Sequence, residues 1–266
     1  MARQRLGQHF LSAPGWRERI LERLPQTAGD VWIEIGAGHG EMTRHLAKRA
    51  RRVIAIEADP ALAAKLQHDV GANPAEWPGV EIVPGDVLTL DLASLAGGET
   101  FRVYGNLPYY ITSPILHQLF GSAGQIASIH IVIQYEVAAR IVARPGRREY
   151  GYLSAACQFY THPEIALKIP PGAFRPPPKV QSALVEMTLP GERAKLSIRD
   201  EAKFLKFIQL CFGQKRKTLR NNLRALASDQ QIRAALENGG LRLDARAEQL
   251  TLAQFSALFA VLYSME

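Results

Sequence analysis

Short apolar runs separated by helical segments make up the first half of the chain. Runs that predict strands lie at residues 31–35, 53–56, 80–84, 102–105 and 128–134. Residues 41–50 have helical composition, and Pro60 predicts a second helix through about Gln67, because proline is favoured in the first turn of a helix. Strands that alternate with helices form βαβ units, so we expect a parallel sheet covered by helices on both faces.

The pattern becomes more helical after Tyr135. Residues 163–189 then predict two strands around the proline-rich turn at 175–178, and Pro190-Gly191 is the predicted domain boundary. Beyond it, a predicted helix closed by Gly213 has one apolar face, made of Phe204, Phe207, Ile208, Cys211 and Phe212. We therefore predict an α/β domain over 1–190 and a small all-helical domain over 191–266.

The composition favours a polyanionic partner and gives no sign of a metal or a membrane. The 266 residues carry a formal charge of +7, which favours nucleic acid. Cys157 and Cys211 are the only cysteines, and no Cys/His cluster has metal-ligand spacing, so we expect no metal. No apolar run has the length of a membrane span, and residues 1–8 lack the apolar region of a signal peptide. We expect a cytoplasmic protein.

A glycine-rich turn follows the first predicted strand, where doubly wound folds bind nucleotides. Glycines let the backbone approach a ligand, and the next helix offers unpaired N–H groups. A dinucleotide-binding turn would need glycine at position 41, where this chain has Glu41. The glycines are instead Gly36, Gly38 and Gly40, and this spacing after Glu34 is similar to the first motif of S-adenosylmethionine-dependent methyltransferases. A tight turn without a ligand stays open as the alternative.

Two acids follow the next two strands. Glu57 ends the second strand, where a carboxylate can accept both hydroxyls of a ribose, a role that NAD-binding proteins share. Asp86 follows the third strand and resembles the acid that accepts from the adenine amine of the cofactor; a helix N-cap is the alternative. Together with the glycine turn, these acids at successive strand ends favour S-adenosylmethionine as the cofactor.

The tetrapeptide Asn106-Leu107-Pro108-Tyr109 follows the fourth predicted strand and is typical of amine methylation. The exocyclic amine of adenine is a poor nucleophile, because its lone pair is delocalised into the ring. The side-chain oxygen of Asn106 and a nearby backbone carbonyl would accept its N–H groups and stabilise the charge that develops on nitrogen. Pro108 stiffens the loop, and Tyr109 offers a face for a base taken out of its stack. A plain turn with a packing tyrosine is the alternative.

Motifs in matching order cover nearly the whole chain. Segments 8–11, 34–38, 85–86, 106–109 and 150–154, together with Glu57, resemble the ribosomal small-subunit adenine dimethyltransferases, called KsgA in bacteria. The resemblance implies a Rossmann-like S-adenosylmethionine-dependent methyltransferase domain followed by a helical RNA-binding domain. His9 and Tyr110 stand where many members carry Asn. The cofactor-binding residues that the resemblance implies are His9, Leu11, Gly36, Gly38, Glu57, Asp86 and Asn106.

Two later stretches also resemble this family. Residues 172–180 are similar to its target-binding motif, in which Phe174 would hold the adenine against Tyr109; a core position is the alternative for Phe174. Residues 215–223 are similar to the basic helix of its small domain. The catalytic residues that the resemblance implies are Asn106, Leu107, Pro108, Tyr109 and Phe174.

Basic residues gather in two places. Between Glu201 and Asp229 the chain has no acidic residue, while a second basic cluster surrounds Pro145-Gly146 in a predicted flexible loop. Lysine and arginine runs neutralise phosphates and position RNA without reading its sequence; a solvated helix face is the alternative. We expect RNA contacts from Arg147, Arg148, Lys215, Arg216, Lys217 and Arg220.

The resemblance implies that the chain methylates N6 of two adjacent adenosines near the 3′ end of 16S rRNA. The substrate would be the small ribosomal subunit, with a role in its maturation, and the enzyme would be a monomer. Two alternatives remain: a related 23S rRNA methyltransferase of the antibiotic-resistance type, and a non-catalytic RNA-binding assembly or transcription factor. DNA adenine methylation is a third and more remote possibility. The number of methyl groups follows from the resemblance alone.

Overall fold

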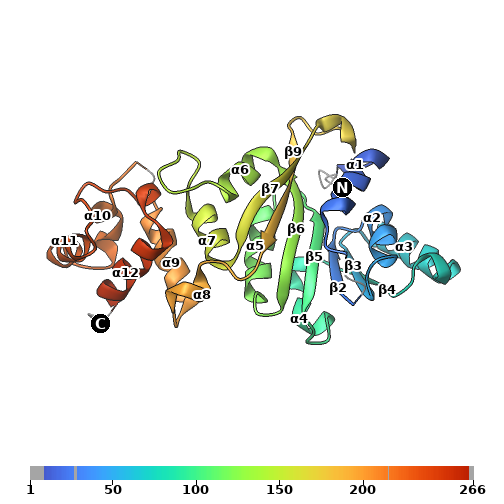
Figure 1. The fold of residues 1–266 in the computed structure, drawn as a ribbon, viewed down its shortest axis with the longest axis horizontal. Helices are drawn as coiled ribbons and strands as arrows, with labels where there is room; N and C mark the ends of the chain where they lie inside the picture. The colour runs from blue at the N-terminus through green and yellow to red at the C-terminus, as the bar shows by residue number, and fades with distance from the viewer. Residues whose placement is uncertain (1–8, 27–28, 215, 264–266) are drawn as a thin grey trace, which may run out of the picture. The chain divides into compact units, whose positions relative to one another are not determined.

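The computed structural model describes residues 9–26, 29–214 and 216–263. The chain forms two compact units (Figure 1). The first unit contains the described residues up to Ala138 together with Pro163–Leu189. The second contains Ala139–His162 and the described residues from Pro190 onward.

A seven-stranded sheet forms the centre of the first unit, in the order β4-β3-β2-β5-β6-β9-β7. Strands β2 to β6 pair in parallel, which confirms the predicted βαβ units. Strand β9 pairs antiparallel with β6. The sheet is therefore mixed, whereas the sequence predicted a parallel sheet; an antiparallel strand at the side of a parallel sheet is common in doubly wound folds. The strands are β2 (Val31–Ile35), β3 (Arg52–Glu57), β4 (Val80–Pro84), β5 (Phe101–Asn106), β6 (Ile126–Gln134), β7 (His162–Ile169) and β9 (Ser182–Thr188).

Helices connect these strands, and two further short strands pair outside the sheet. Helix α3 begins at Pro60 as predicted, and the Asp59 carboxylate caps it by accepting from the N–H groups of Ala61 and Leu62. The short strands β1 (Phe10–Leu11) and β8 (Phe174–Arg175) pair antiparallel. The helices are α1 (Pro14–Arg23), α2 (Glu41–Ala47), α3 (Pro60–Ala72), α4 (Leu92–Leu95), α5 (Thr112–Gly121) and the 3-10 turns η1 (Pro74–Glu76), η2 (Val87–Thr89) and η3 (Pro171–Ala173).

The direction of the crossovers reverses between β2 and β5. From β2 the chain proceeds to β3 and β4 on one side, and from β5 it proceeds to β6 on the other. Because parallel crossovers are right-handed, helices of the two halves cover opposite faces, and a crevice opens where the order reverses. The residues after β2 and β5 are therefore brought together at the carboxyl edge of the sheet.

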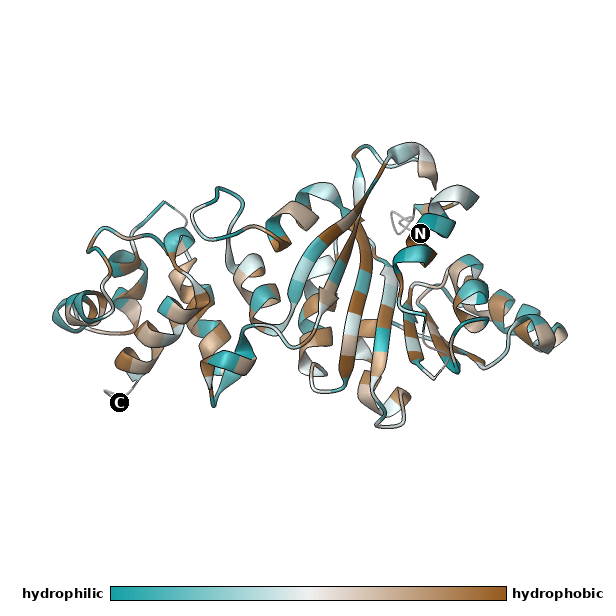
Figure 2. Ribbon diagram, viewed as in Figure 1, coloured by the Kyte–Doolittle hydropathy of each residue, from teal (hydrophilic) through white to brown (hydrophobic). Residues whose placement is uncertain are grey.

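The core of the first unit is apolar along the strands. Hydrophobic positions recur along β5, β6 and β9 in Figure 2. One face of the sheet packs under α1 and α2, where Leu21, Trp32 and Leu46 are buried in the same cluster. Burial of a side chain of this size contributes about 1.5–3 kcal/mol, so this cluster holds the N-terminal helix against the sheet.

Helices make up most of the second unit. Helix α9 has the predicted apolar face, and Phe204, Phe207, Ile208 and Cys211 are all buried. Helix α11 carries mostly hydrophilic residues, and its buried positions are Ile232, Ala235 and Leu236 (Figure 2). Helix α6 (Tyr135–Ile141) spans the division between the two units, which falls after Ala138. The other helices are α7 (Tyr152–Tyr160), α8 (Arg193–Leu196), α9 (Glu201–Cys211), α10 (Leu219–Asn222), α11 (Asp229–Asn238), α12 (Leu252–Tyr263) and the turns η4 (Leu223–Ala225) and η5 (Ala247–Gln249).

Residues 139–162 lie in the second unit, although the sequence assigned them to the first domain. The reason is aromatic packing. The Phe159 ring lies 5.2 Å from that of Phe204, and the Tyr150 ring lies 5.9 Å from that of Phe212. These contacts join segments far apart in the chain, so local patterns could not reveal them. The division at 190 as a functional domain boundary stays a prediction.

Within the described part of the chain, no helix is long and apolar enough to cross a membrane. The same residues contain no group of three or more His, Cys, Asp or Glu side chains placed to hold a metal ion.

Substitution of Gly40 should test the turn before α2. Gly40 has φ +77°, and an added Cβ would lie 2.4 Å from Leu66 Cδ1 and 2.8 Å from Trp77 Cη2. We expect Gly40→Ala to lower the free energy of unfolding by about 2–4 kcal/mol through left-handed strain and overpacking. Urea unfolding followed by circular dichroism measures this. Gly71→Ala is the control, because that helical glycine has open space around it and should gain about 0.5–1 kcal/mol. Equal midpoints for the two variants would contradict the interpretation.

Candidate active site

An open cavity of about 820 Å³, solvent at its mouth included, lies at the carboxyl edge of the first unit's sheet. It is lined by the turn after β2, the ends of β3 and β4, and residues 106–111 after β5, together with His9 and Phe10. The cavity lies at the reversal of strand order, as the fold requires.

The glycine turn follows β2, where the sequence predicted it. Gly36, Gly38 and Gly40 all have positive φ, which side chains rarely tolerate. The N–H groups of Gly36 and Ala37 donate to the Ile56 carbonyl at 2.8 and 3.1 Å, which ties the turn to β3. A Cβ at Gly38 would lie 3.0 Å from the Phe10 ring. The bare backbone of Gly36 and Gly38 therefore forms part of the cavity wall.

Glu57 is buried at the end of β3 and holds the turn in place. One carboxylate oxygen accepts from the Gly38 N–H at 2.7 Å, and the other accepts from the Asp59 N–H at 2.9 Å. Each carboxylate oxygen has a second acceptor site, so Glu57 can still receive a ligand hydroxyl. Its place in the cavity wall fits the predicted contact with the ribose of the cofactor.

Asp86 lies after β4, at the exposed side of the cavity. One oxygen accepts from the Leu88 N–H at 3.0 Å and caps η2, which was the structural alternative. The side chain also lines the cavity, and its second oxygen is available for an amine. Capping fixes the carboxylate in one orientation, so the structural role and the predicted cofactor contact are compatible.

Asn106 ends β5 with its amide held in one orientation. The Nδ2 group donates to the His9 carbonyl at 2.8 Å. The side-chain oxygen receives none of the hydrogen bonds found among the described residues, and the residue lines the cavity. Asn106 therefore presents an acceptor to a ligand, as amine methylation requires.

The residue directly after Asn106 offers a further backbone acceptor. The Leu107 N–H donates to the Val132 carbonyl at 3.0 Å, which anchors the loop to β6. The Pro108 carbonyl accepts from the Ile111 N–H at 3.2 Å and closes a turn into α5. Within the described residues, the Leu107 carbonyl is not used in this way. It is the best candidate for the second acceptor that the sequence left unspecified.

Tyr109 is half-buried, and its hydroxyl lies 2.9 Å from Ser182 Oγ on β9. Burial raises the pKa of this hydroxyl, so it stays a neutral phenol at physiological pH. The His9 ring is 5.7 Å away and tilted by 31°. The His9 Nδ1 atom lies 2.7 Å from the Pro176 carbonyl, which can only accept, so Nδ1 carries the proton.

Phe174 does not face the cavity in this structure. Its side chain is 2% exposed and belongs to the core cluster under α1, and its backbone pairs with Leu11. Phe174 is therefore a core residue here, as in the alternative interpretation of the sequence, because burial in the core stabilises a large aromatic side chain. A role against Tyr109 would require the ring to leave that position.

Leu11 is also buried in that cluster, and it lines a smaller recess beside the cavity. Glu34, which precedes the glycine turn in the sequence motif, lines the same recess. The carboxyl is 2% exposed, and its Oε2 has no hydrogen-bond partner among the described residues. Burial, together with the nearby charge of Glu57, raises the pKa of Glu34 to about 8, while the Thr43 hydroxyl acts against this.

A doubly wound domain in which a held asparagine amide lines a cavity at the carboxyl edge of the sheet fits the class of S-adenosylmethionine-dependent amine methyltransferases. Comparison with known proteins gives the family. The sequence profile described as ribosomal RNA adenine dimethylase matches residues 1–263. The chain belongs to this family, and it is an S-adenosylmethionine-dependent enzyme.

Relatives agree with this assignment over nearly their whole length. The chain is 41% identical to the ribosomal RNA small subunit methyltransferase A of Koribacter versatilis, covering 96% of this chain and 92% of the relative. It is 40% identical to the enzyme of the same name from Xanthomonas campestris, covering 97% and 95%.

Solved structures confirm the fold. A dimethyladenosine transferase from Plasmodium falciparum superposes with a TM-score of 0.76 at 22% identity, covering 94% of this chain and 96% of that one. The 23S rRNA methyltransferase ErmE superposes with a TM-score of 0.71 at 27% identity, covering 96% and 99%.

The protonation of Glu34 should appear in the pH dependence of stability. The folded pKa of about 8 lies above the ordinary value of 4.5, so the folded protein holds a proton that the unfolded chain has released. Stability should fall by about 1–2 kcal/mol as the pH rises from about 6.5 to 8. Glu34→Gln should lose this slope, because a glutamine has no proton to release. Unfolding free energies of the cofactor-free protein at several pH values test this, and parallel curves for the two proteins would rule it out.

Proposed function

We propose that this protein dimethylates N6 of two adjacent adenosines near the 3′ end of 16S rRNA in the small ribosomal subunit. We further propose that it acts as a monomer in the cytoplasm and contributes to maturation of the subunit. The proposal rests on Asn106, whose amide nitrogen donates to the His9 carbonyl, so that its oxygen stays available to a ligand in the cavity. The names of relatives at 41% and 40% identity support the choice of small-subunit RNA.

The geometry supports amine methylation at this site. S-adenosylmethionine supplies a methyl group activated by a positively charged sulfur. The Asn106 Oδ1 atom and the Leu107 carbonyl can accept the two N–H groups of an adenine amine and stabilise the charge that develops on its nitrogen. No side chain is needed to remove a proton beforehand, because the nitrogen becomes acidic after alkylation. The Tyr109 ring can support the base from one side.

The roles of the cofactor-binding residues follow from their places in the cavity wall. We assign the ribose to Glu57, the adenine of the cofactor to Asp86, and the close backbone approach to Gly36 and Gly38. His9 contributes through its backbone carbonyl, which orients Asn106. Histidine can therefore stand at position 9, where many family members carry asparagine, because the anchoring atom belongs to the main chain.

The second unit is the proposed RNA-binding region. Arg147 and Arg148 are exposed there, in a loop that is tied down: the Gly146 N–H donates to the Glu248 carbonyl at 2.7 Å. The Leu219 N–H donates to the Ala245 carbonyl at 2.8 Å, so the second basic segment is anchored to the same 245–249 region. Phosphate contacts from both segments could thus act together.

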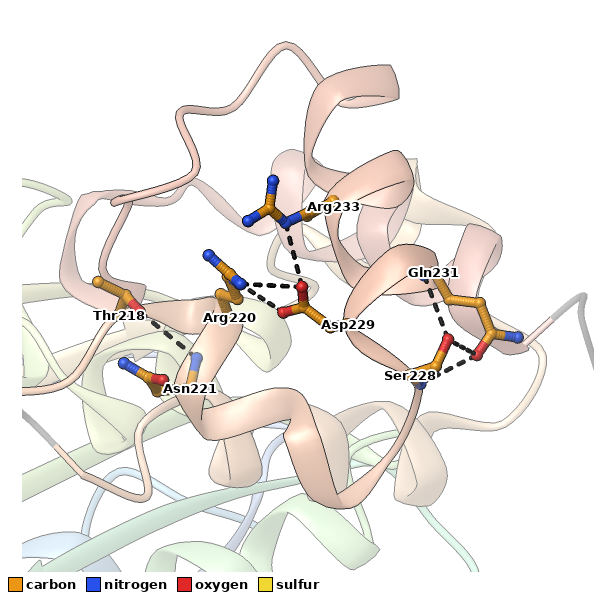
Figure 3. A network of polar contacts seen from close by, with 7 residues as sticks. All are labelled: Thr218, Arg220, Asn221, Ser228, Asp229, Gln231 and Arg233. Atoms are coloured by element: carbon orange, nitrogen blue, oxygen red, sulfur yellow. Dashed lines mark hydrogen bonds and ion pairs between the residues drawn. The ribbon is translucent and has the colours of Figure 1, made fainter.

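The predicted RNA-binding residues differ in how available their charges are. Arg216 and Lys217 are exposed, whereas Lys215 lies outside the described residues. Arg220 instead makes two hydrogen bonds to Asp229, the longer at 2.8 Å, and Asp229 also receives Arg233 at 3.1 Å (Figure 3). Asp229 offsets part of this positive charge, so Arg216 and Lys217 are the stronger candidates for phosphate contacts.

Methylation of large-subunit RNA is the second candidate function. The likeness to ErmE over nearly the whole chain favours keeping it. Assay of purified small and large subunits in separate reactions, with mass identification of the methylated nucleosides, distinguishes the two. Product on the large subunit alone would reverse the assignment.

Substitution of Asn106 tests the catalytic assignment. We expect Asn106→Ala to lower kcat by at least about 100-fold, because one charge-stabilising acceptor is lost. RNA binding should be unchanged. Asn106→Asp is the matched variant: it keeps an oxygen but loses the N–H donated to His9, so it should retain partial activity. Methyl transfer to small subunits lacking the mark measures both. Full turnover by Asn106→Ala would refute the assignment.

Charge reversal of Arg216 and Lys217 tests the RNA-binding segment. The double Glu variant should bind small subunits more weakly, and the slope of log affinity against log salt should become shallower by about two. Lys48→Glu/Lys65→Glu is the control, with the same change in net charge on exposed residues of the first unit. An equal effect of both variants would show that only net charge matters.

A further inference from the structure

Tyr110 is an exposed aromatic side chain in the wall of the active-site cavity. Within the described residues, Tyr110 and Val180 are the large hydrophobic side chains that remain exposed, at 62% and 47%. Only Tyr110 lines the cavity, directly after the Asn106–Tyr109 loop. An exposed apolar side chain at a ligand cavity favours a binding role over chance exposure.

The backbone places Tyr110 differently from Tyr109. The Ile111 N–H donates to the Pro108 carbonyl and α5 starts at Thr112, so the turn between them is fixed. The Tyr109 hydroxyl is bonded to Ser182, and its ring is half-buried. The Tyr110 ring is left in solvent. Two consecutive aromatic side chains therefore offer one inner and one outer surface.

We propose that Tyr110 is a positioning residue whose ring stacks on the base next to the target adenine in the RNA strand. This inference rests on the proposed transfer to adenine at Asn106. The target base must reach the acceptors inside the cavity, where Tyr109 lies. Adjacent Cα atoms are about 3.8 Å apart, so a base that continues the strand outward meets Tyr110 next. Stacking on an aromatic ring accepts any base, because every base has a π-face.

Charges beside the cavity suit the backbone of the same nucleotides. Residues 174–182, which comprise β8 and the chain up to the start of β9, are tied to the cavity wall through His9 with Pro176, and through Tyr109 with Ser182. Within this segment Arg175 and Lys179 are exposed, and neither forms an ion pair among the described residues. Sites for single-stranded nucleic acid combine basic side chains, which follow the backbone, with aromatic rings on which bases stack.

The proposal has a consequence for two adjacent adenosines. While one adenine occupies the site at Asn106, its neighbour lies on Tyr110. Exchange of the two bases then needs a shift of one nucleotide along the strand, with the ring as a support on both occasions. Loss of the ring should therefore affect capture of the strand more than the transfer step at Asn106.

Three variants separate stacking from simple apolar contact. We expect Tyr110→Ala to raise KM for small subunits lacking the mark by about 5- to 150-fold, the range for loss of one stacked base, with kcat nearly unchanged. Tyr110→Phe should restore KM, because the flat ring remains. Tyr110→Leu should not, because it keeps apolar area without a π-face. An unchanged KM in Tyr110→Ala, or full rescue by Leu, would overturn the proposal.

A direct probe of the neighbouring base completes the test. A synthetic RNA hairpin with two adjacent unpaired adenosines carries 2-aminopurine in place of one, and its fluorescence should be quenched by the wild type but not by Tyr110→Ala. A hairpin abasic at that position should bind both proteins equally. Equal quenching by both proteins would overturn stacking. The fluorescence does not depend on turnover. If the wild type methylated no ribosomal RNA, the proposed function would be wrong, while the quenching would still show whether Tyr110 stacks on the base.

Discussion

The hydrogen bond from Asn106 Nδ2 to the His9 carbonyl is the interaction on which the candidate site depends. An amide can present either its donor or its acceptor to a ligand, and chemistry at an amine requires the acceptor. By occupying the N–H side, His9 leaves the oxygen for the cavity. The bond also joins the segment before β1 to the end of β5, so the N-terminal helix, packed by Leu21 and its neighbours, becomes part of the catalytic arrangement.

Around the glycine turn, two acids likewise hold the backbone and line the cavity at the same time. Glu57 accepts from the Gly38 N–H and so stabilises the conformation of the turn, and it also lines the cavity. Asp86 caps η2 and lines the cavity as well. Each acid is held by backbone donors before any ligand arrives, which limits the entropy lost on binding.

Two aromatic residues, Phe174 and Tyr110, differ from what the sequence alone suggested about the RNA-binding surface. Phe174 is buried in the core, so of the two rings expected to hold the adenine only Tyr109 lines the cavity, followed in the chain by the exposed ring of Tyr110. In the second unit, Asp229 pairs with Arg220 and Arg233 (Figure 3). Arg216 and Lys217 remain exposed. Charge pairing inside the unit thus reduces a uniformly basic sequence segment to a smaller set of available cations.

The sequence alone determined the strand-and-helix order, the cofactor turn and the loop that begins at Asn106, because these depend on periodicity and on glycine and proline at fixed offsets. Tertiary structure decided the antiparallel β9, the grouping of residues 139–162 with the second unit, the burial of Phe174 and the ion pairing of Arg220. Each of these depends on contacts between segments far apart in the chain. Periodicity reports which side of an element is apolar, but it does not report which distant segment covers that side.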